Sequence, residues 1–426
     1  MTTNSISNLI SGMHSMDDYD PNSMSVAKAR LHIRNYLNPI TESELVDLRS
    51  SLGCILATDI LSPANVPNYD NSAMDGYAFN ADDITPNVST ELMIIATVFA
   101  GKAFDGTLAA GECVRIMTGG AMPKGADTVI MQERVQCEAN IIRFTEAPKR
   151  TMNVRYAGED LRLGQVVLTS GHLMRAADLG LLASLGIAKI PVYRKLKVAF
   201  FSTGDELASV GQSLETGQVY DSNRYTLHGM LTRMGVEVID MGAIPDNPDL
   251  LQSTLLTASQ LADVVISSGG VSVGEADYMK LLLTRHGQVV FWKIAMKPGR
   301  PLAYGKVGNA HYFGLPGNPV AVMVTFYQFV REAMLVLMGQ PQPTQLPVFN
   351  VECTENIKKM TGRTEFQRGV LFADKDGIWK VKPTGAQGSA ILSSMSLANC
   401  FIVLDEATGN LSAGAIVQVQ VLDGLV

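Results

Sequence analysis

The segment 263–277 joins a buried-strand pattern to residues that could hold a phosphate. It reads DVVISSGGVSVGEAD, so an apolar run gives way to glycines and ends with Glu275 and Asp277. Glycine-rich loops after the strands of an α/β sheet expose backbone N–H groups, and anions bind to such groups. The loop has neither the Gly-Lys-Ser/Thr ending of a P-loop nor the spacing of a dinucleotide fingerprint. A tight structural turn is therefore an equal alternative for this segment taken alone.

Acidic side chains follow two other predicted strands of the same section. Glu206 comes just after the apolar run 197–204, and Asp246 comes just after the run 237–244. Parallel neighbouring strands could bring Glu206, Asp246 and Asp277 to one edge of a sheet, and oxygen-rich clusters of this kind suit Mg²⁺. The alternative is that the Asp and Ser residues of these loops cap helix N-termini. Capping explains any single loop, but it explains the combination less well.

Two lysines supply the opposite charge. In the segment FWKIAMKPGRP, Lys293 and Lys297 lie four residues apart, so an extended chain places both on one face of a strand. Their apolar neighbours favour anion binding, whereas surface solvation is the alternative for most lysines. The later turn GLPGNP sets Pro316 and Pro319 before a helix. Its backbone amides could face an anion, or the prolines could simply make a stiff helix start.

The elements that must position these residues alternate between strands and helices. We expect strands at 197–204, 237–244 and 263–270, and helices at 223–235 and 249–262. This rhythm predicts a parallel sheet covered by helices.

An apolar helix at 320–339 ends this section. Its length is compatible with a membrane span. Gln328, Arg331 and Glu332 interrupt the apolar run, which favours a buried core helix or a subunit-interface helix.

The flanking segments have different textures. Residues 1–24 are polar and lack both a basic start and an unbroken apolar stretch, so we expect a flexible leader and not a signal peptide. Apolar residues at helical spacing predict helices at 25–37 and in the segment 172–190, where the helix should end at Gly186. Short apolar runs between turn residues predict a β-rich domain from about 55 to 155. Beyond the proline-rich linker 339–347, alternating segments predict a β-barrel or sandwich.

Composition limits the kind of protein. A chain of 426 residues is long enough for about three domains. The net charge of -7 argues against general nucleic-acid binding, so any anion site must be local. The five cysteines are far apart and form no CxxC pair, which argues against disulfides and zinc fingers. We therefore expect a soluble, cytoplasmic protein that binds neither nucleic acid nor membranes.

Residues 71–78, NSAMDGYA, form a polar cluster without an evident packing role, and RIMTG follows at 115–119. The residue types alone assign no reaction to these segments. Ser72 has no convincing triad, because the histidines of the chain show no pattern that pairs one with it.

Several motifs in a fixed order resemble one enzyme family. They are NSAMDGYA, RIMTGG, GED at 158–160, FSTGDEL, SSGGVSVGEADY, FWKIAMKPGRP and GLPGNP. Together they resemble the molybdopterin molybdenumtransferases of the bacterial MoeA type, a family that also forms the C-terminal domain of gephyrin. The resemblance extends from about residue 25 to residue 426.

The resemblance implies an enzyme of molybdenum cofactor biosynthesis that inserts molybdenum from molybdate into adenylylated molybdopterin and releases AMP. It implies Mg²⁺ as cofactor, a homodimer, and as protein partners the molybdopterin adenylyltransferase and the acceptors of the finished cofactor. It also implies four parts, which follow the flexible leader expected at 1–24. They are a helical domain of 25–55 plus 160–193, an inserted β-rich domain at 56–159, an α/β molybdopterin-binding domain at 194–340 and a C-terminal β-barrel at 345–426.

The resemblance also assigns roles to residues by motif. The catalytic positions are Asp75, Thr118, Glu206, Asp246, Asp277, Lys293 and Lys297. The metal positions are Glu206, Asp246 and Asp277. The positions that bind pterin, phosphate or molybdate are Arg155, Asp160, Gly269, Gly270, Ser272, Pro316, Pro319, Arg363 and Ser389. Asp75 and Thr118, supported by Arg155 and Asp160, would reach the site from the other subunit.

Three residues depart from the family pattern. Arg300 stands where Lys is usual, Tyr156 interrupts a stretch that is often more basic, and Ala386 replaces a frequent His. These changes bear on substrate contacts and on affinity for molybdate.

Two other functions could account for parts of this sequence. The adenylyltransferase that acts one step earlier resembles only the 194–340 section, so NSAMDGYA and the C-terminal segment argue against it. A scaffold that clusters other proteins is the second rival, and nothing in this chain resembles a scaffold linker.

Overall fold

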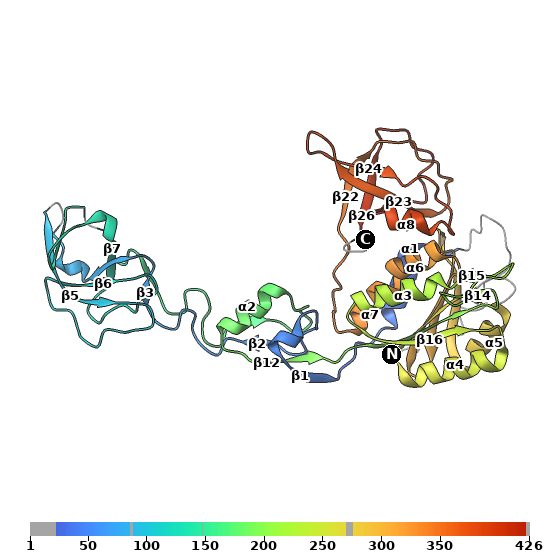
Figure 1. The fold of residues 1–426 in the computed structure, drawn as a ribbon, viewed down its shortest axis with the longest axis horizontal. Coiled ribbons are helices and arrows are strands. Elements are labelled where there is room, and N and C mark those ends of the chain that lie inside the picture. The colour runs from blue at the N-terminus through green and yellow to red at the C-terminus, as the bar shows by residue number, and fades with distance from the viewer. Residues whose placement is uncertain (1–22, 86–87, 147, 270–275, 423–426) are drawn as a thin grey trace. The chain divides into compact units, whose positions relative to one another are not determined.

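A computed structural model describes residues 23–85, 88–146, 148–269 and 276–422, without the side chains of 276–278, 280 and 290–292. The chain divides into two compact units (Figure 1). The larger unit comprises Met1–Glu44, Gly53–Ile55 and Val192–Val426, and the smaller comprises Leu45–Leu52 and Leu56–Pro191. Each unit is described by itself.

A six-stranded sheet forms the centre of the larger unit, in the order β16-β13-β17-β21-β20-β18. Its strands are β13 (Lys197–Thr203), β16 (Glu237–Ile244), β17 (Val264–Ser268), β18 (Gly287–Lys293), β20 (Pro301–Val307) and β21 (Ala310–Leu315). The first four strands in the sheet order run parallel, as predicted, but β20 runs antiparallel to both of its neighbours, β21 and β18. The prediction of a parallel sheet is corrected to a mixed one, because β20 and β21 are joined by a two-residue turn that only an antiparallel pair permits.

The two helices predicted at 223–235 and 249–262 are confirmed as α3 (Ser222–Arg233) and α4 (Pro248–Leu261). Helix α5 (Ala276–His286) was not predicted. Strands β13 and β17 are buried along almost their whole length, as expected for strands covered on both faces. Phe201 and Val265 pack against Leu255 of α4 and Leu283 of α5 in one core cluster. Ser202 faces the other side, where α3 contacts β13.

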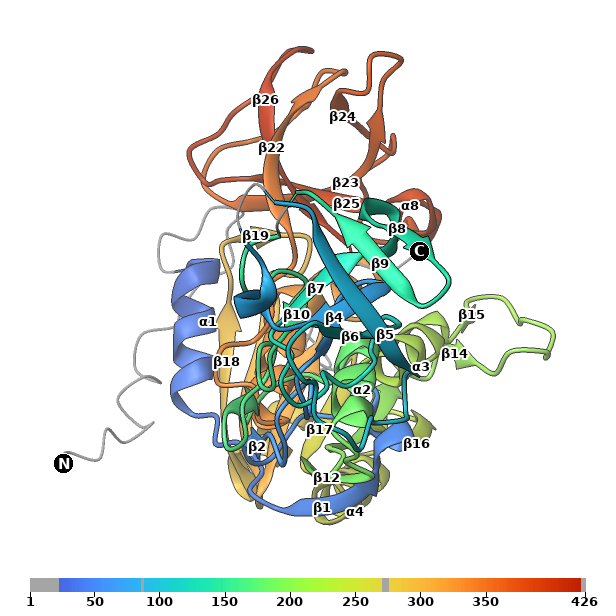
Figure 2. The same cartoon turned by 90° about the vertical axis from the view of Figure 1, so that its left-hand side faces the viewer.

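A small excursion separates β13 from α3 and was not predicted. It contains β14 (Leu207–Ala208) and β15 (Val219–Tyr220), which pair in parallel and project from the body of the larger unit (Figure 2). Each strand is two residues long, which is too short for a periodic signal in the sequence.

The apolar helix is continuous from Pro319 to Leu337, as α6 (Pro319–Thr325), the π-helix η5 (Phe326–Val330) and α7 (Arg331–Leu337). By length and composition it could cross a membrane, yet 83% of its apolar window is buried inside the protein. The prediction of a buried helix is confirmed.

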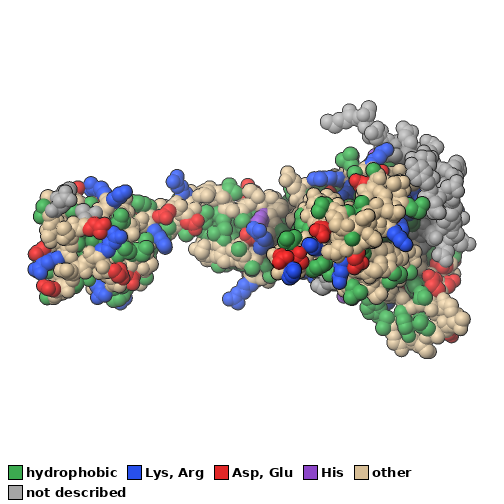
Figure 3. Space-filling view, turned by 90° about the horizontal axis from the view of Figure 1, so that it is seen from above, with side chains coloured by type: hydrophobic (Ala, Val, Ile, Leu, Met, Phe, Trp, Pro, Cys, Tyr) green, Lys and Arg blue, Asp and Glu red, His purple; other side chains and the backbone are tan. Residues whose placement is uncertain are grey.

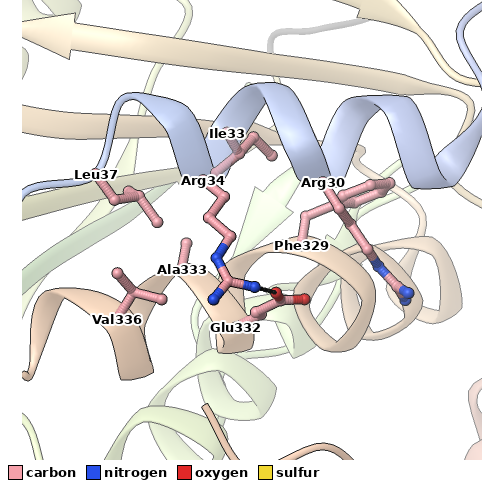
Figure 4. Close-up of a pocket in the computed structure, with 8 residues that line it drawn as sticks. All are labelled: Arg30, Ile33, Arg34, Leu37, Phe329, Glu332, Ala333 and Val336. Atoms are coloured by element: carbon pink, nitrogen blue, oxygen red, sulfur yellow. Dashed lines mark ion pairs between the residues drawn. The ribbon is translucent and has the colours of Figure 1, made fainter. Parts of the chain in front are cut away.

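Helix α1 (Val26–Asn35) packs against this buried helix. Arg34 faces Glu332 across a small pocket, at 3.8 Å between their charged atoms (Figure 4). Arg30 donates from Nε to the Gln328 carbonyl (2.8 Å) and also reaches the Gln328 side chain. Gln328 Nε2 in turn donates to Gln420 Oε1 (2.8 Å). Polar side chains thus link α1, the π-helix and the C-terminal region.

The C-terminal region is a closed barrel, as predicted. Its strands are β22 (Val348–Cys353), β23 (Thr364–Ala373), β24 (Trp379–Pro383), β25 (Cys400–Leu404) and β26 (Ile416–Val421). The barrel closes because β23 pairs with both β24 and β25. Val351, Val381, Ile402 and Val419 fill its interior. Strand β19 (Met296–Lys297) pairs with β23, and helix α8 (Leu392–Leu397) precedes β25.

The smaller unit is β-rich, as predicted. Its main sheet has the order β7-β4-β6-β5-β9-β8. These strands are β4 (Gly76–Phe79), β5 (Thr90–Val98), β6 (Glu112–Ile116), β7 (Thr128–Met131), β8 (Gln136–Glu138) and β9 (Ile141–Phe144). Phe79, Leu92, Cys113 and Ile142 form one side of its core.

Short elements complete the chain. They are β1 (Ser43–Asp47), η2 (Leu48–Ser51), β2 (Ile60–Leu61), β3 (Asn71–Ser72), η3 (Ala81–Asp83), η4 (Gln132–Arg134), β10 (Val154–Arg155), β11 (Val166–Leu168), α2 (Ala176–Ser184) and β12 (Lys189–Tyr193). Helix α2 ends just before Gly186 (φ 73°), as predicted, and the chain becomes a strand at Lys189. It begins at Ala176, later than the predicted segment 172–190 does. Helix α1 belongs to the larger unit and α2 to the smaller. The finer division into a leader and four parts stays a prediction.

Buried His311 makes the stability of the larger unit depend on pH. The side chain is 5% exposed and stacks on Tyr304. Burial lowers its pKa to about 4, with Lys306 acting in the same direction and Asp263 against it. Since the unfolded imidazole has a pKa near 6.5, protons bind the unfolded chain first as the pH falls. We expect the free energy of unfolding to drop by on the order of 3 kcal/mol between about pH 6.5 and pH 4.

His311→Gln should flatten that pH dependence, measured by urea unfolding at several pH values. The exposed His228→Gln is the control, because this side chain keeps its water contact on folding. An identical slope in wild type and His311→Gln would contradict the assignment.

Gly269 directly follows β17 and lies against Thr203 at the end of β13. Its φ is 94°, and a Cβ there would lie 2.6 Å from the Thr203 carbonyl oxygen. Gly235 also has a positive φ (74°) but open space around it. Gly235→Ala should cost about 1 kcal/mol from backbone strain alone. Gly269→Ala should cost about 1–3 kcal/mol more from the clash. Urea midpoints compare the two, and equal losses would rule out the clash.

Candidate functional site

The carboxyl ends of β13 and β16 bring together two of the predicted acidic residues and one more. The Asp246 backbone N–H donates to Asp205 Oδ1 (3.0 Å), and the Glu206 carboxylate lies over Gly204. Burial raises the pKa of Asp246, and the charges of Asp205 and Glu206 raise it further. Like charges held this close favour a bound cation or a proton. Asp205 was not predicted as a site residue.

Asp277 lies in the first turn of α5, and its side chain is outside the described part of the structure. Among the described residues, no three His, Cys, Asp or Glu side chains form a metal-binding group. The oxygen donors of Glu206 and Asp246 nevertheless suit Mg²⁺, which usually binds one or two carboxylates and completes its shell with water and phosphate oxygens.

The end of β17 and the GLPGNP turn lie side by side at the same edge. Gly269 N–H donates to the Leu315 carbonyl (3.2 Å), and Ser268 Oγ donates to the Pro316 carbonyl (3.4 Å). Among the described residues, a Cβ on Gly317 would meet only the Gly269 Cα, at 3.9 Å. Pro319 begins α6 after the N-cap residue Asn318. Gly270 and Ser272 lie outside the described residues.

Two residues at the start of α3 were missed by sequence reasoning. Asp221, the N-cap, accepts from Ser202 Oγ (3.0 Å) and from the Arg224 N–H (3.1 Å) through one oxygen. Asn223 Nδ2 donates to Ser268 Oγ (2.9 Å) and to the Gly317 carbonyl (2.6 Å). Burial raises the pKa of Asp221. The sequence signal is the polar run DSN at 221–223, which forms the N-cap and the first two residues of α3.

The predicted arrangement of the two lysines is wrong. Lys293 ends β18, whereas Lys297 lies in β19, which pairs with β23 of the barrel. The chain therefore leaves one sheet and joins another between them, so they do not share the face of one strand. Lys297 Nζ lies 3.5 Å from Glu365 Oε1, and its side chain is half exposed. Arg300 holds this crossing through its carbonyl, which accepts from the Ile294 N–H (2.7 Å).

In the barrel, Arg368 contacts the loop that holds Ser389. Arg368 is 1% exposed and donates to Ser394 Oγ (2.9 Å), the Gly388 carbonyl (2.9 Å) and the Ala386 carbonyl (3.4 Å). Burial lowers its pKa to about 10. The Ser389 carbonyl accepts from the Val320 N–H of α6 (3.1 Å).

Arg363, the predicted partner of Ser389, lies in the turn before β23, and no hydrogen bond within the described residues joins it to this loop. Sequence reasoning did not single out Arg368 of the segment FQRG, because the residue pattern does not reveal that this arginine is buried.

In the smaller unit, Asp75 and Thr118 are brought together. Asp75 Oδ1 accepts from the Thr118 N–H (2.7 Å) and from Thr118 Oγ1 (2.8 Å). These two hydrogen bonds hold the pKa of Asp75 below its usual value. Both residues are exposed, so the pair is fixed in place and open to a ligand.

The residues expected to support this pair, Arg155 and Asp160, belong to the same smaller unit. Arg155 is exposed on β10, which pairs with β3 beside NSAMDGYA. Asp160 is exposed and donates its N–H to the Val66 carbonyl (2.9 Å). Tyr156 is exposed and donates its N–H to Glu159 (3.1 Å).

The surface charges are mixed. On the face drawn in Figure 3, acidic and basic side chains are interspersed over each unit. Together with the net charge of -7, this agrees with anion binding at local sites and not over a broad surface.

Three family models match successive parts of the chain. They are the MoeA N-terminal region (domain I and II) at residues 24–186, a probable molybdopterin binding domain at 199–335, and the MoeA C-terminal region (domain IV) at 350–422.

Known proteins match nearly the whole chain. A molybdopterin molybdenumtransferase of Haemophilus influenzae is 46% identical over 93% of this chain and 98% of its own length. Gephyrin of Dictyostelium discoideum is 32% identical over 88% of this chain and 59% of its own length. The crystal structure of the molybdopterin biosynthesis MoeA protein of Pyrococcus horikoshii OT3 matches with a TM-score of 0.82 at 30% identity, over 94% of this chain and all of that one. The chain therefore belongs to the MoeA family of molybdopterin molybdenumtransferases.

Proposed function

We propose that this chain transfers molybdenum from molybdate to adenylylated molybdopterin and releases AMP. The observation that carries the proposal is the strand-end cluster of Asp205, Glu206 and Asp246 beside the bare backbone of Gly269, in a chain of this family. Oxyanions repel one another, so a site that joins two of them must supply cations and N–H donors. The reaction breaks the phosphoanhydride bond between AMP and molybdopterin phosphate, with water as the acceptor of the adenylyl group.

Glu206 and Asp246, with Asp277, would hold Mg²⁺. The ion would supply positive charge to the phosphate oxygens and lower the pKa of a bound water. Support comes from the oxygen donor set and from the mutual repulsion that raises the pKa of Asp246. The N–H groups of the loop that contains Gly269, Gly270 and Ser272 would hold the phosphates, and the turn with Pro316 and Pro319 would border the same site.

The cationic residues would hold oxyanions. The Lys297 side chain is half exposed and pairs with Glu365. The Glu365 side chain is only 3% exposed and cannot move away easily, so a bound anion would compete with this carboxylate for Lys297. Lys293 would contribute from the end of β18. Arg363 and Ser389 would contact molybdate, and Arg368 adds a buried positive charge behind the loop of Ser389.

We further propose that the protein acts as a homodimer in the cytoplasm, with the partner subunit's Asp75 and the partner subunit's Thr118 completing each site. Arg155 and Asp160 would support that contribution. The fixed and exposed Asp75–Thr118 pair supports this assignment, because it serves no core packing. The adenylyltransferase that makes the substrate and the enzymes that take up the cofactor are its expected protein partners.

The purified chain should release AMP from adenylylated molybdopterin only when Mg²⁺ and molybdate are both present, and should yield active cofactor. AMP is followed by chromatography, and the cofactor by reconstitution of an apo-molybdoenzyme. Asp246→Asn should lower the rate of AMP release at least about 100-fold, because the cluster loses one negative charge and one carboxylate that would bind Mg²⁺. The exposed Asp249→Asn, three residues further along, is the matched control. Release of AMP without molybdate dependence would defeat the insertion proposal.

Mixed dimers test the shared site. Asp75→Ala and Asp246→Ala chains should each be inactive alone, but a heterodimer retains one site with both carboxylates. Refolding or co-expression of the two variants, with heterodimers purified by two tags, should restore up to about half of the wild-type activity per dimer. If confirmed heterodimers stay inactive, each site is built from a single chain.

A further inference from the structure

The first turn of α3 holds two buried oxygens for which the described part of the structure offers no hydrogen-bond partner. They are Asp221 Oδ2 and Asn223 Oδ1. The Asp221 side chain is one of the most buried carboxylates in the protein, with 4% of the residue exposed. Buried acceptors are nearly always paired in folded proteins, so unpaired ones call for a physical explanation.

Helix capping does not explain these oxygens. The capping of α3 uses Asp221 Oδ1, which accepts from both Ser202 Oγ and the Arg224 N–H. The contact of α3 with the sheet uses Asn223 Nδ2. A serine at the cap position would serve the first role without a second buried oxygen.

Arg224 acts on the Asp221 carboxylate through its charge, but within the described residues it forms no ion pair with it. Arg224 directs its guanidinium to Asp240, with 2.7 Å and 2.8 Å from Nε to the two carboxylate oxygens. A buried carboxylate without a paired cation is costly, and it is kept where a ligand supplies the missing donors.

The two side chains lie over neighbouring strands at the carboxyl edge of the sheet. Asp221 bonds to Ser202 of β13, and Asn223 bonds to Ser268 of β17. Ser202 and Ser268 are partners in the parallel register, so the two side chains bond to neighbouring strands, which lie about 4.8 Å apart. Gly317 accepts from Asn223 through its carbonyl, and among the described residues an added Cβ on Gly317 would meet the Gly269 Cα at 3.9 Å. The backbone at Gly317 thus leaves room for a flat ring.

Acceptors of this kind select a ligand with two neighbouring hydrogen-bond donors. Phosphate and molybdate carry no such donors at neutral pH. The adenylylated substrate of the proposed function carries two pairs, the N–H and amino group on the pyrimidinone edge of the pterin and the two ribose hydroxyls. The bare backbone of Gly317 favours the ring.

We propose that Asp221 and Asn223 form the subsite that recognises the amino-pyrimidinone edge of the pterin. The N–H and amino groups of that edge donate to Asp221 Oδ2 and Asn223 Oδ1, while the phosphates extend toward the loop at Gly269. This inference rests on the proposed function and adds to it two specificity-determining residues.

Asp221→Asn tests the subsite without removing the helix cap. Asparagine caps a helix as well as aspartate does, but it presents an N–H₂ group where the wild type presents an acceptor. Binding of molybdopterin and of AMP to the full chain is measured separately by titration calorimetry under anaerobic conditions. We expect affinity for molybdopterin to fall at least about tenfold and affinity for AMP to stay within about twofold.

Asp240→Asn is the matched control, since it removes a carboxylate beside the same helix but outside the subsite. It should leave both affinities unchanged. Asp221→Ser, which keeps a capping oxygen and lacks the free one, should reproduce the loss and serves if the Asn variant is unstable.

Unchanged molybdopterin affinity in both Asp221 variants would overturn the proposal. Loss of AMP affinity alone would overturn it in favour of the ribose, and equal loss for both ligands would mean general distortion of the edge. If the wild type binds neither ligand, the proposed function itself fails, which is a different result from wild-type binding that the variants do not weaken.

Discussion

The Asn223 amide nitrogen joins three segments that are far apart in the sequence. It donates to Ser268 at the end of β17 and to Gly317 in the turn before α6, while its own residue sits in the first turn of α3. These bonds hold the loops at the carboxyl edge in one place, and the parallel register of β13, β17 and β21 makes the three ends level enough for one side chain to reach them. The acidic cluster, the glycine loop and the GLPGNP turn all depend on that alignment, because none of them belongs to a regular element.

The charges of the candidate site are distributed by type of element. Carboxylates lie on loops after strands, where the pKa of Asp246 rises because its neighbours are also acidic. Cations lie at the crossing between two sheets and on the barrel strand β23, where the buried Arg368 is held by carbonyl and hydroxyl oxygens. Neutral dipoles stabilise a buried cation without cancelling its charge, so the field of Arg368 still reaches the loop it supports. In a substrate that carries both phosphate and a bound cation, the cation would be complementary to the carboxylates and the phosphate to the basic side chains.

The sequence predicted the strands and helices between 194 and 340 well, because long periodic runs such as KVAFFST and LLQSTLLTASQL are hard to place otherwise. It missed β14 and β15, which are two residues each, and the antiparallel direction of β20, since strand direction leaves no mark on side-chain periodicity. It placed Glu206 and Asp246 together correctly by the rule for strand ends. It set Lys293 and Lys297 on one strand, because spacing cannot reveal that the chain changes sheets. Asp221 and Asn223 were missed because a capping motif looks ordinary until its unused oxygens are seen.

The polar chain from Arg30 through Gln328 to Gln420 has a consequence for how this sequence can change. The three side chains come from α1, the π-helix and β26, and each satisfies a partner that is shielded from water. Replacement of one of these side chains by an apolar residue would leave its neighbour without a hydrogen-bond partner. Replacement of all three by apolar residues could leave an interior that is free of water and well packed. Among related chains these positions should therefore vary as a set, so that their covariation would record the docking of the barrel on the α/β core.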